Sequence, residues 1–276
     1  MADHDETSAA ATAGPAGRPA GDPVPPPART GAGRGGLLDR ASTGGRAAWA
    51  WVDDRRAKVA VGVGLALVVL GLAGFLAVFD AVQEGDDLAA LDDPVLDGLA
   101  GARSDALTVF LEAVSAVTGP VVLPIVVVVA ALVWGRFGRS WWQAGLLAGA
   151  MLLSTLVSVT LKAVIARPRP PVDTMLVPGA ETTYSFPSGH TIGTATFLLV
   201  VAYLLWAPRP SWTWLVGGLA LVAGGVVLVA LSRLYLGYHF VTDVVASMAL
   251  AVAVLGVVVA VDRRRAGRAA AATVPG

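Results

Sequence analysis

The sequence predicts an all-α membrane protein, a bundle of six transmembrane helices preceded by a disordered N-terminal tail. Hydrophobic residues make up 55% of the 276 residues and charged residues 14%, with a mean hydropathy of +0.69, whereas soluble domains carry about 25% charged residues. Uncharged stretches of about eighteen or more residues recur along the chain, and each can cross a bilayer core of about 30 Å as a helix. A soluble globule is therefore excluded.

Apolar stretches bounded by charged residues are the predicted spans. They cover residues 59–79, 120–135, 140–161, 191–208, 210–232 and 244–261. The second span comes from a longer uncharged run between Glu112 and Arg136. Gly119 and Pro120 break this run near its start, so the span begins at Pro120 and an interfacial helix is expected before it. An even number of spans places both termini on one side of the membrane.

The segments outside the spans are predicted to be tails. Residues 1–56 are rich in Ala, Gly, Pro and Arg and show no sustained apolar period, so they cannot bury enough surface to offset the entropy of ordering. We expect a disordered cytoplasmic tail at 1–56, a six-span domain at 57–263 and a cytoplasmic C-terminal tail at 264–276. The first long apolar run begins only at Val59 and is interpreted as an uncleaved anchor rather than a signal peptide.

Charged residues between the spans predict the orientation. Basic residues precede the first span, occupy the turns near 136–139 and 209, and follow the last span, whereas the connection between Asp80 and Asp105 holds six acidic residues and Arg103 as its only cation. The positive-inside bias then places both termini in the cytoplasm and this connection on the extracytoplasmic side of the membrane. The residues that violate the bias are Lys162, Arg167, Arg169 and Arg233.

Composition also limits the chemistry. The chain has no Cys, which excludes disulfides, zinc thiolate sites, cysteine-ligated iron–sulfur clusters and a cysteine nucleophile. Twenty Lys and Arg balance twenty Asp and Glu, so the net charge predicts no nucleic-acid partner. Any reaction must use His, Asp, Ser, Lys or Arg.

Ionisable residues gather at four predicted helix ends that lie on one side of the membrane. Lys162 ends the third span, His190 begins the fourth, Arg233 ends the fifth, and His239 and Asp243 precede the sixth. Burying such groups costs several kcal/mol unless they are paired or ligated, so they are functional candidates.

Two of these segments have a local geometry suited to chemistry. Ser188 and Gly189 before His190 are typical of a helix start, with Ser188 as N-cap and free backbone amides that can bind an anion. His239 and Asp243 are four residues apart and share a helix face, so the carboxylate can fix the imidazole tautomer. Taken singly, each pattern also fits an ordinary helix cap or a structural His–Asp pair, and the cations near 162–169 fit snorkelling at the interface.

Three spaced motifs make the pattern specific. They read Lys162-x6-Arg169-Pro170, then Pro187-Ser188-Gly189-His190, then Ser232-Arg233-x5-His239-x3-Asp243, all within residues 140–261. In this order they resemble the signature of the type-2 phosphatidic acid phosphatase superfamily, also called the lipid phosphate phosphatases. The richness in Ala, Gly, Val and Arg suggests a bacterial member.

The resemblance implies a role for each residue. His239 would form a phosphohistidine, Asp243 would orient it, and His190 would protonate the leaving oxygen and later activate water. The phosphoryl oxygens would be bound by Lys162, Arg169, Ser188, Gly189 and Arg233, with Arg167 as an auxiliary cation. No cluster of acidic residues accompanies the histidines, so no metal is expected, and no cofactor is implied.

The expected activity is hydrolysis of a lipid phosphate or diphosphate at the extracytoplasmic face. Undecaprenyl diphosphate or another polyprenyl diphosphate is preferred, because an outward-facing site would act after the carrier has delivered its cargo. Phosphatidic acid and phosphatidylglycerol phosphate are the alternatives within the class. The expected partner is a membrane lipid, and the sequence is compatible with a homo-oligomer without fixing the oligomeric state.

Other classes of function fit less well. An anion or lipid transporter predicts ionisable residues distributed through the membrane depth, with broken helices at the midplane; here the ionisable residues lie at one edge. Haloperoxidase-like use of vanadate occurs in soluble relatives, and the predicted spans argue against it.

Overall fold

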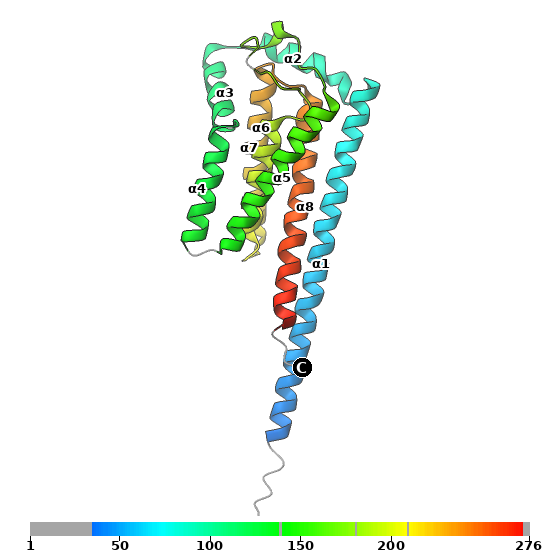
Figure 1. Ribbon diagram of the computed structural model, residues 1–276, viewed down its shortest axis with the longest axis vertical. Helices are drawn as coiled ribbons and strands as arrows, with labels where there is room; N and C mark the ends of the chain where they lie inside the picture. The colour runs from blue at the N-terminus through cyan, green and yellow to red at the C-terminus, as the bar shows by residue number, and fades with distance from the viewer. Residues whose placement is uncertain (1–34, 138–139, 180, 209, 273–276) are drawn as a thin grey trace, which may run out of the picture. The chain divides into compact units, whose positions relative to one another are not determined.

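The computed structural model describes residues 35–137, 140–179, 181–208 and 210–272 (Figure 1). The chain divides into two units, 1–46 and 47–276, and the second carries the spans and the candidate site. The described residues form helices and no strand, which confirms the all-α prediction. The α-helices are α1 (Gly35–Glu84), α2 (Asp92–Gly101), α3 (Asp105–Val117), α4 (Val122–Arg136), α5 (Trp141–Ile165), α6 (Gly189–Trp206), α7 (Trp212–Tyr235) and α8 (Val241–Ala272).

Within the described ranges, five helices are long and apolar enough to cross a bilayer by themselves: Arg55–Glu84 within α1, Trp141–Ile165, Gly189–Trp206, Trp212–Tyr235 and Val241–Ala269 within α8. Helices α3 and α4 pass the same test only as a pair, bent by 53°. Gly119 and Pro120 lie at the bend, where proline lacks the donor that would continue the helix and restricts the residue before it. The predicted six spans are obtained when this pair counts as one broken span.

The terminal helices are longer than predicted. Helix α1 begins at Gly35, inside the segment 1–56 assigned to a tail, and α8 ends at Ala272, beyond residue 263. Ala, Leu and Arg have high helix propensity, and extending an existing helix avoids the cost of nucleation. Disorder stays a prediction for residues 1–34, which lie outside the described residues.

Small residues bring α1 and α8 into close contact, and the two helices run side by side (Figure 1). A Cβ atom built on Gly71 of α1 would lie 2.5 Å from the carbonyl oxygen of Ala249 and 2.6 Å from the amide of Ala253 on α8. One on Gly256 of α8 would lie 2.5 Å from the carbonyl oxygen of Gly64. Such contacts between backbones drive helix association in a membrane, where apolar burial contributes little.

One end of the bundle is covered by connecting segments, and this end positions the candidate site. There α5 and α7 end, α6 and α8 begin, and α2 lies across them (Figure 1). Phe186, just before α6, is fully buried in a core with Ile192, Ala246 and Leu250. Its ring centroid lies 5.7 Å from that of Phe75 on α1, so the segment before α6 is anchored to the apolar core.

Candidate active site

The predicted residues meet around one cavity at this end of the bundle. The cavity has a volume of about 320 Å³, and five of the eight predicted site residues line it: Lys162, Arg169, Gly189, His190 and His239. Lys162 comes from the last turn of α5, and Gly189 and His190 from the first turn of α6. The two histidines therefore face a shared space, as the sequence analysis predicts.

His239 is oriented by Asp243, in the first turn of α8. Its Nδ1 lies 3.1 Å from Oδ2 of Asp243 and 3.3 Å from Oγ of Ser185, and its Nε2 lies 3.4 Å from NH1 of Arg169. A guanidinium group can only donate, so Nε2 is the acceptor and the ring proton sits on Nδ1. Nε2 thus keeps a lone pair on the side of Arg169, which also lines the cavity.

Burial keeps the His239 imidazole neutral. The side chain is 1% exposed, and burial lowers its pKa to about 3 against the opposing effect of the hydrogen bond to Asp243. Desolvation disfavours a charged imidazole, whereas a nearby carboxylate favours it. A neutral ring with an unprotonated Nε2 is the form that can act as a nucleophile.

The Asp243 carboxylate is held by several donors. Its Oδ2 accepts hydrogen bonds from the Ser185 hydroxyl and from the Phe240 amide, the latter at 2.9 Å, in addition to the contact with His239. Its Oδ1 accepts from NH1 of Arg167 at 2.8 Å. A carboxylate with this many partners is fixed in position, so the orientation of His239 is fixed as well.

Arg167 links two buried carboxylates behind His239. Besides Asp243 it contacts Oδ2 of Asp92 through NH2 at 2.8 Å, and its guanidinium lies 4.4 Å from the centroid of the Phe240 ring. Asp92, at the start of α2, also accepts from the Thr242 amide at 3.0 Å and the Thr242 hydroxyl at 2.7 Å. The guanidinium of Arg167 is thus engaged in joining α2 to α8, away from the cavity.

Arg169 and Lys162 are positioned by backbone carbonyl groups. Arg169 donates to the carbonyl oxygens of Thr183 at 2.6 Å and Tyr238 at 2.7 Å. Lys162 donates from Nζ to the carbonyl oxygens of Tyr184 and Ser185, the latter at 3.1 Å. These bonds tie the loop before α6 to α5 and hold two cations at the cavity wall.

Glu181 is a site residue that sequence reasoning missed. Its Oε2 lies 3.1 Å from NH2 of Arg169, and its Oε1 pairs with NH2 of Arg233. Burial alone would raise the pKa of Glu181, but the guanidinium groups of Arg233 and Arg169 hold it below the ordinary value. The carboxylate therefore stays charged and occupies the position between the two arginines where an anion would bind.

Two predicted phosphate ligands lie behind the cavity wall. Ser188 is fully buried as the N-cap of α6, where its hydroxyl oxygen accepts from the Thr191 amide at 3.5 Å. Arg233 is 1% exposed and donates from NH1 to the Ser115 hydroxyl at 2.5 Å. Its Nε has no hydrogen-bond partner in the described part of the chain, so this arginine keeps one donor that a further acceptor could use.

The cavity has an apolar side as well as a cationic one. Its apolar lining comes from α4, α5 and α6 and includes Leu123, Pro124, Met151, Val159 and Ile192. The bend between α3 and α4 contributes Gly119, where an added Cβ atom would lie 3.4 Å from Nε2 of His190. An amphiphile with an anionic head group and an apolar tail fits this division.

The donor set for a metal is poor. In the residues described, no three or more His, Asp or Glu side chains form a group that could hold a metal ion. The fold brings two further carboxylates, Glu181 and Asp92, to this end of the bundle. Both carboxylates are paired with arginines rather than gathered around a common point.

Fold and site together define a multi-pass α-helical membrane protein with a His–Asp pair and a cavity with a cationic wall at one end of the bundle. Residues 143–266 match the PAP2 superfamily. This region, which carries all eight predicted site residues, belongs to that superfamily, and the resemblance found in the sequence is confirmed.

Individual relatives agree with this assignment. The chain is 35% identical over 129 residues to phosphatidylglycerophosphatase B of Bacillus subtilis, covering 46% of this chain and 61% of the relative. It is 34% identical over 111 residues to an undecaprenyl-diphosphatase of Sulfolobus acidocaldarius, covering 36% of this chain and 48% of the relative. These matches thus span about half to three fifths of the curated relatives.

A solved structure extends the similarity beyond the matched segment. The fold superimposes on the crystal structure of a transmembrane PAP2-type phosphatidylglycerolphosphate phosphatase from Bacillus subtilis with a TM-score of 0.59 and 26% sequence identity. The superposition covers 73% of this chain and 96% of that chain. The similarity of fold therefore includes helices outside residues 143–266.

Proposed function

We propose that this protein is a membrane phosphatase that removes the terminal phosphate from a lipid phosphate or lipid diphosphate through a phosphohistidine on His239. The observation that carries the proposal is the single cavity in which a neutral His239 and a cationic wall meet an apolar lining from α4, α5 and α6. The head group would enter the cationic side, and the tail would stay on the apolar side, next to the bilayer.

In the first chemical step Nε2 of His239 attacks phosphorus, and the bond between phosphorus and the leaving oxygen breaks. His190, which lines the same cavity, gives its proton to that oxygen. The ring becomes positively charged as the phosphohistidine forms, and Asp243 at 3.1 Å stabilises this charge. In the second step His190 takes a proton from water, which attacks phosphorus, releases inorganic phosphate and restores His239.

The cations act on the charge that spreads over the transferring group. The phosphoryl oxygens in the transition state are stabilised by donors already in place, because such donors need no reorganisation during the reaction. Lys162, Arg169 and the Gly189 amide line the cavity, and Arg233 lies behind it with an unused Nε. Substrate phosphate would displace Glu181 from Arg169 and Arg233, since phosphate carries more charge and more acceptor oxygens than one carboxylate.

A polyprenyl diphosphate is the substrate we favour, on the argument that a site facing outwards acts after a lipid carrier has delivered its cargo. The relative from Sulfolobus acidocaldarius, which is named an undecaprenyl-diphosphatase, is consistent with this choice. Phosphatidylglycerol phosphate is the second candidate, because two Bacillus subtilis matches are named for that activity. Phosphatidic acid is the third.

A panel of these lipids, assayed side by side with purified protein in EDTA, tests both the substrate and the proposed independence from metal. We expect phosphate release in EDTA, with the highest kcat/KM for the polyprenyl diphosphate. A tenfold or greater preference for phosphatidylglycerol phosphate would replace the favoured substrate and leave the chemistry intact. Activity that requires an added divalent cation would contradict the metal-independent mechanism.

The nucleophile is tested by trapping the intermediate. With a substrate carrying radioactive phosphate, the wild-type protein and a His190→Ala variant should hold acid-labile, base-stable label, and the variant should hold it longer because water is no longer activated. His239→Ala should hold none and release no phosphate. Turnover by a correctly folded His239→Ala protein would remove His239 as the nucleophile.

We further propose that the protein lies in the cell membrane with both termini in the cytoplasm and the site outside. The chain has no Cys, so single cysteines report the topology directly. Asp97→Cys, at an exposed position of α2, should react with an impermeant thiol reagent in intact cells, and Arg136→Cys, at the end of α4, only after permeabilisation. The reverse pattern would invert the orientation.

A further inference from the structure

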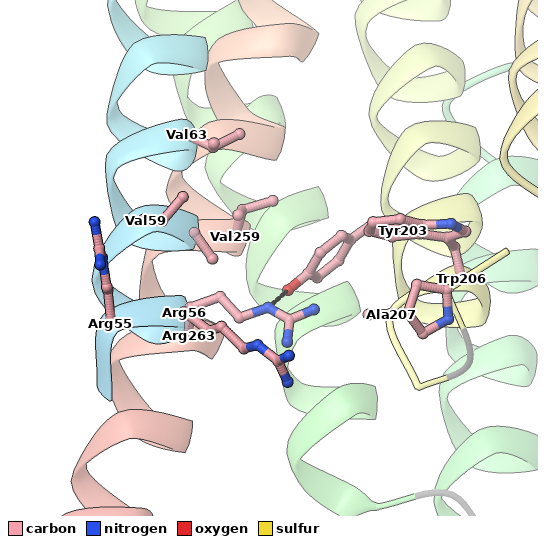
Figure 2. Close-up of a pocket in the computed structure, with 11 residues that line it drawn as sticks. Arg55, Arg56, Val59, Val63, Tyr203, Trp206, Ala207, Val259 and Arg263 are labelled. Carbon is pink, nitrogen blue, oxygen red and sulfur yellow. Dashed lines mark hydrogen bonds between the residues drawn. The ribbon is translucent and has the colours of Figure 1, made fainter. Parts of the chain in front are cut away.

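A second cavity lies at the other end of the bundle, between α1, α6 and α8 (Figure 2). It has a volume of about 730 Å³. It is lined by Tyr203 of α6, thirteen positions after His190, and by Arg263 of α8, twenty positions after Asp243. At 1.5 Å per helical residue these separations correspond to roughly 20–30 Å along the helices. The cavity is therefore distinct from the candidate active site.

One side of this cavity is cationic and aromatic. Arg56 of α1 and Arg263 of α8 extend their guanidinium groups toward Tyr203 and Trp206, while Arg55 points away (Figure 2). Arg263 donates from Nε to the Tyr203 hydroxyl at 3.1 Å, and its terminal nitrogens point into the open space (Figure 2). Two guanidinium groups facing a common space form a site for a phosphate oxyanion, which guanidinium binds with a matching planar geometry.

The neighbouring acidic residue, Asp262, contacts two aromatic side chains. Asp262 accepts hydrogen bonds from the Tyr203 hydroxyl at 2.8 Å and from Nε1 of Trp142 at 2.9 Å. Its carboxylate thus orients Tyr203, whose hydroxyl then accepts from Arg263. The polar contacts hold Arg263 at the cavity and leave the positive charge of its terminal nitrogens facing inward.

The other side of the cavity is apolar. Val59 and Val63, one turn apart on α1, and Val259 on α8 line it. Val59 is 62% exposed and Val63 52% exposed, so the protein itself leaves these side chains uncovered next to the bilayer. A soluble anion would contact the arginines and leave this wall bare, whereas a lipid chain would cover it.

We propose that this cavity binds an anionic phospholipid from the leaflet opposite the candidate active site. The phosphodiester would lie between Arg56 and Arg263, and one acyl chain would lie along Val59, Val63 and Val259. Tyr203 and Trp206 are of the residue types that favour the head-group level of a bilayer, and basic pockets between transmembrane helices are suited to anionic lipids. The lipid is a bound component that joins α1 to α6 and α8, and it is not a substrate.

Thermal unfolding of the purified protein in a neutral detergent tests the site, because a ligand that binds the folded state raises the unfolding midpoint. Short-chain phosphatidylglycerol should raise the midpoint saturably. Phosphatidylcholine with the same chains tests the need for negative charge, and glycerophosphoglycerol, which has the head group without chains, tests the need for a tail. Both should require at least tenfold higher concentrations for the same shift.

Variants then locate the effect. Arg56→Gln and Arg263→Gln should each raise the apparent Kd for phosphatidylglycerol about tenfold, equivalent to about 1.4 kcal/mol. Val63→Trp, which fills the apolar side without changing charge, should do the same. Arg136→Gln, at the exposed end of α4, and Val69→Trp, at a 67% exposed position of α1 outside the cavity, are the matched controls and should bind as the wild type does.

The outcomes are decisive in both directions. Equal shifts with phosphatidylcholine would overturn recognition of the charge, and equal shifts with glycerophosphoglycerol would assign the site to a free anion. An equal loss in Arg136→Gln would mean general surface electrostatics. Arg169→Gln, at the candidate active site, should keep the full shift, and loss of the shift there would place the bound phospholipid in the first cavity instead.

Discussion

Oε2 of Glu181 lies 3.1 Å from NH2 of Arg169, and the other oxygen of the same carboxylate pairs with Arg233. A side chain of the protein therefore occupies the space between two arginines that the sequence assigns to phosphate. The single negative charge of this carboxylate is shared between two buried cations. Any phosphoryl group that uses both arginines must first displace this carboxylate.

Glu181→Gln removes the competing charge and should tighten the binding of inorganic phosphate. We expect its inhibition constant as a competitive inhibitor to fall about tenfold, since about 1.4 kcal/mol corresponds to a factor of ten. The measurement is phosphate inhibition of lipid hydrolysis. Asp173→Asn, an exposed position in the same loop, makes the same charge change away from the arginines and should have no effect. Weaker phosphate binding in Glu181→Gln would mean that Glu181 positions the arginines rather than competing.

Asp243→Asn should lower kcat by about 10³-fold or more with little change in KM, because an amide can donate to Nδ1 and favour the tautomer with Nε2 protonated. That tautomer has no lone pair to attack phosphorus. Ser185→Ala removes one of the donors to Asp243 and should cost far less. Steady-state kinetics with the preferred lipid measure both effects. Equal losses in the two variants would argue against the tautomer explanation.

Arg167→Gln should destabilise the fold more than it alters the cavity. The side chains of Arg167 and Asp92 are only 16% and 6% exposed, and breaking a buried ion pair costs about 3 kcal/mol. The unfolding midpoint in detergent should fall clearly. The double variant Arg167→Gln/Asp92→Asn should recover part of the loss, because the stranded carboxylate becomes neutral. Strictly additive effects of the two substitutions would show that the pair is not coupled.

The free energy of unfolding should fall as the pH falls from 7 to 5, and the titration of His239 should cause part of this decrease. Burial lowers its pKa in the folded state to about 3 from an ordinary 6.5, so below pH 6.5 the unfolded chain takes up a proton that the folded protein does not. One such proton corresponds to a slope of up to about 1.4 kcal/mol per pH unit. Glu181 contributes in the same direction only below its ordinary pKa of 4.5.

His239→Asn should therefore flatten the dependence of the unfolding midpoint on pH between 7 and 5. The measurement compares the two proteins in the same detergent at each pH. Parallel curves would contradict the neutral, buried imidazole that the proposed nucleophile requires.

Several features of the site could be predicted from the sequence because they are local or follow from the apolar runs. Charges bound each apolar stretch, so alternate ends of successive spans meet on one side, and Lys162, His190 and His239 had to lie at one end of the bundle. The contact between His239 and Asp243 was predicted from a shared helix face, but His239 lies two residues before α8, and the irregular segment leading into this helix brings its ring to Asp243. The helix break at Gly119 and Pro120 could also be predicted, because proline has no backbone N–H to continue a helix.

Other contacts had no local signal. Thr242 and Asp92 are 150 residues apart and hydrogen-bonded, and Glu181 lies in a loop with no periodic pattern. Ser188 and Arg233 carry the right chemistry for binding phosphate, yet packing places them behind the cavity wall.

The sequence by itself determined that this is a membrane protein with helical spans and which basic and imidazole groups gather at one end of them. Only the tertiary structure decided which carboxylate pairs with which arginine, which side chains reach the cavity, and that a second cationic cavity lies at the opposite end. The physical reason is how far apart in the sequence the interacting groups lie. Helix formation and membrane insertion depend on neighbouring residues, whereas ion pairing and cavity shape depend on groups that only folding brings together.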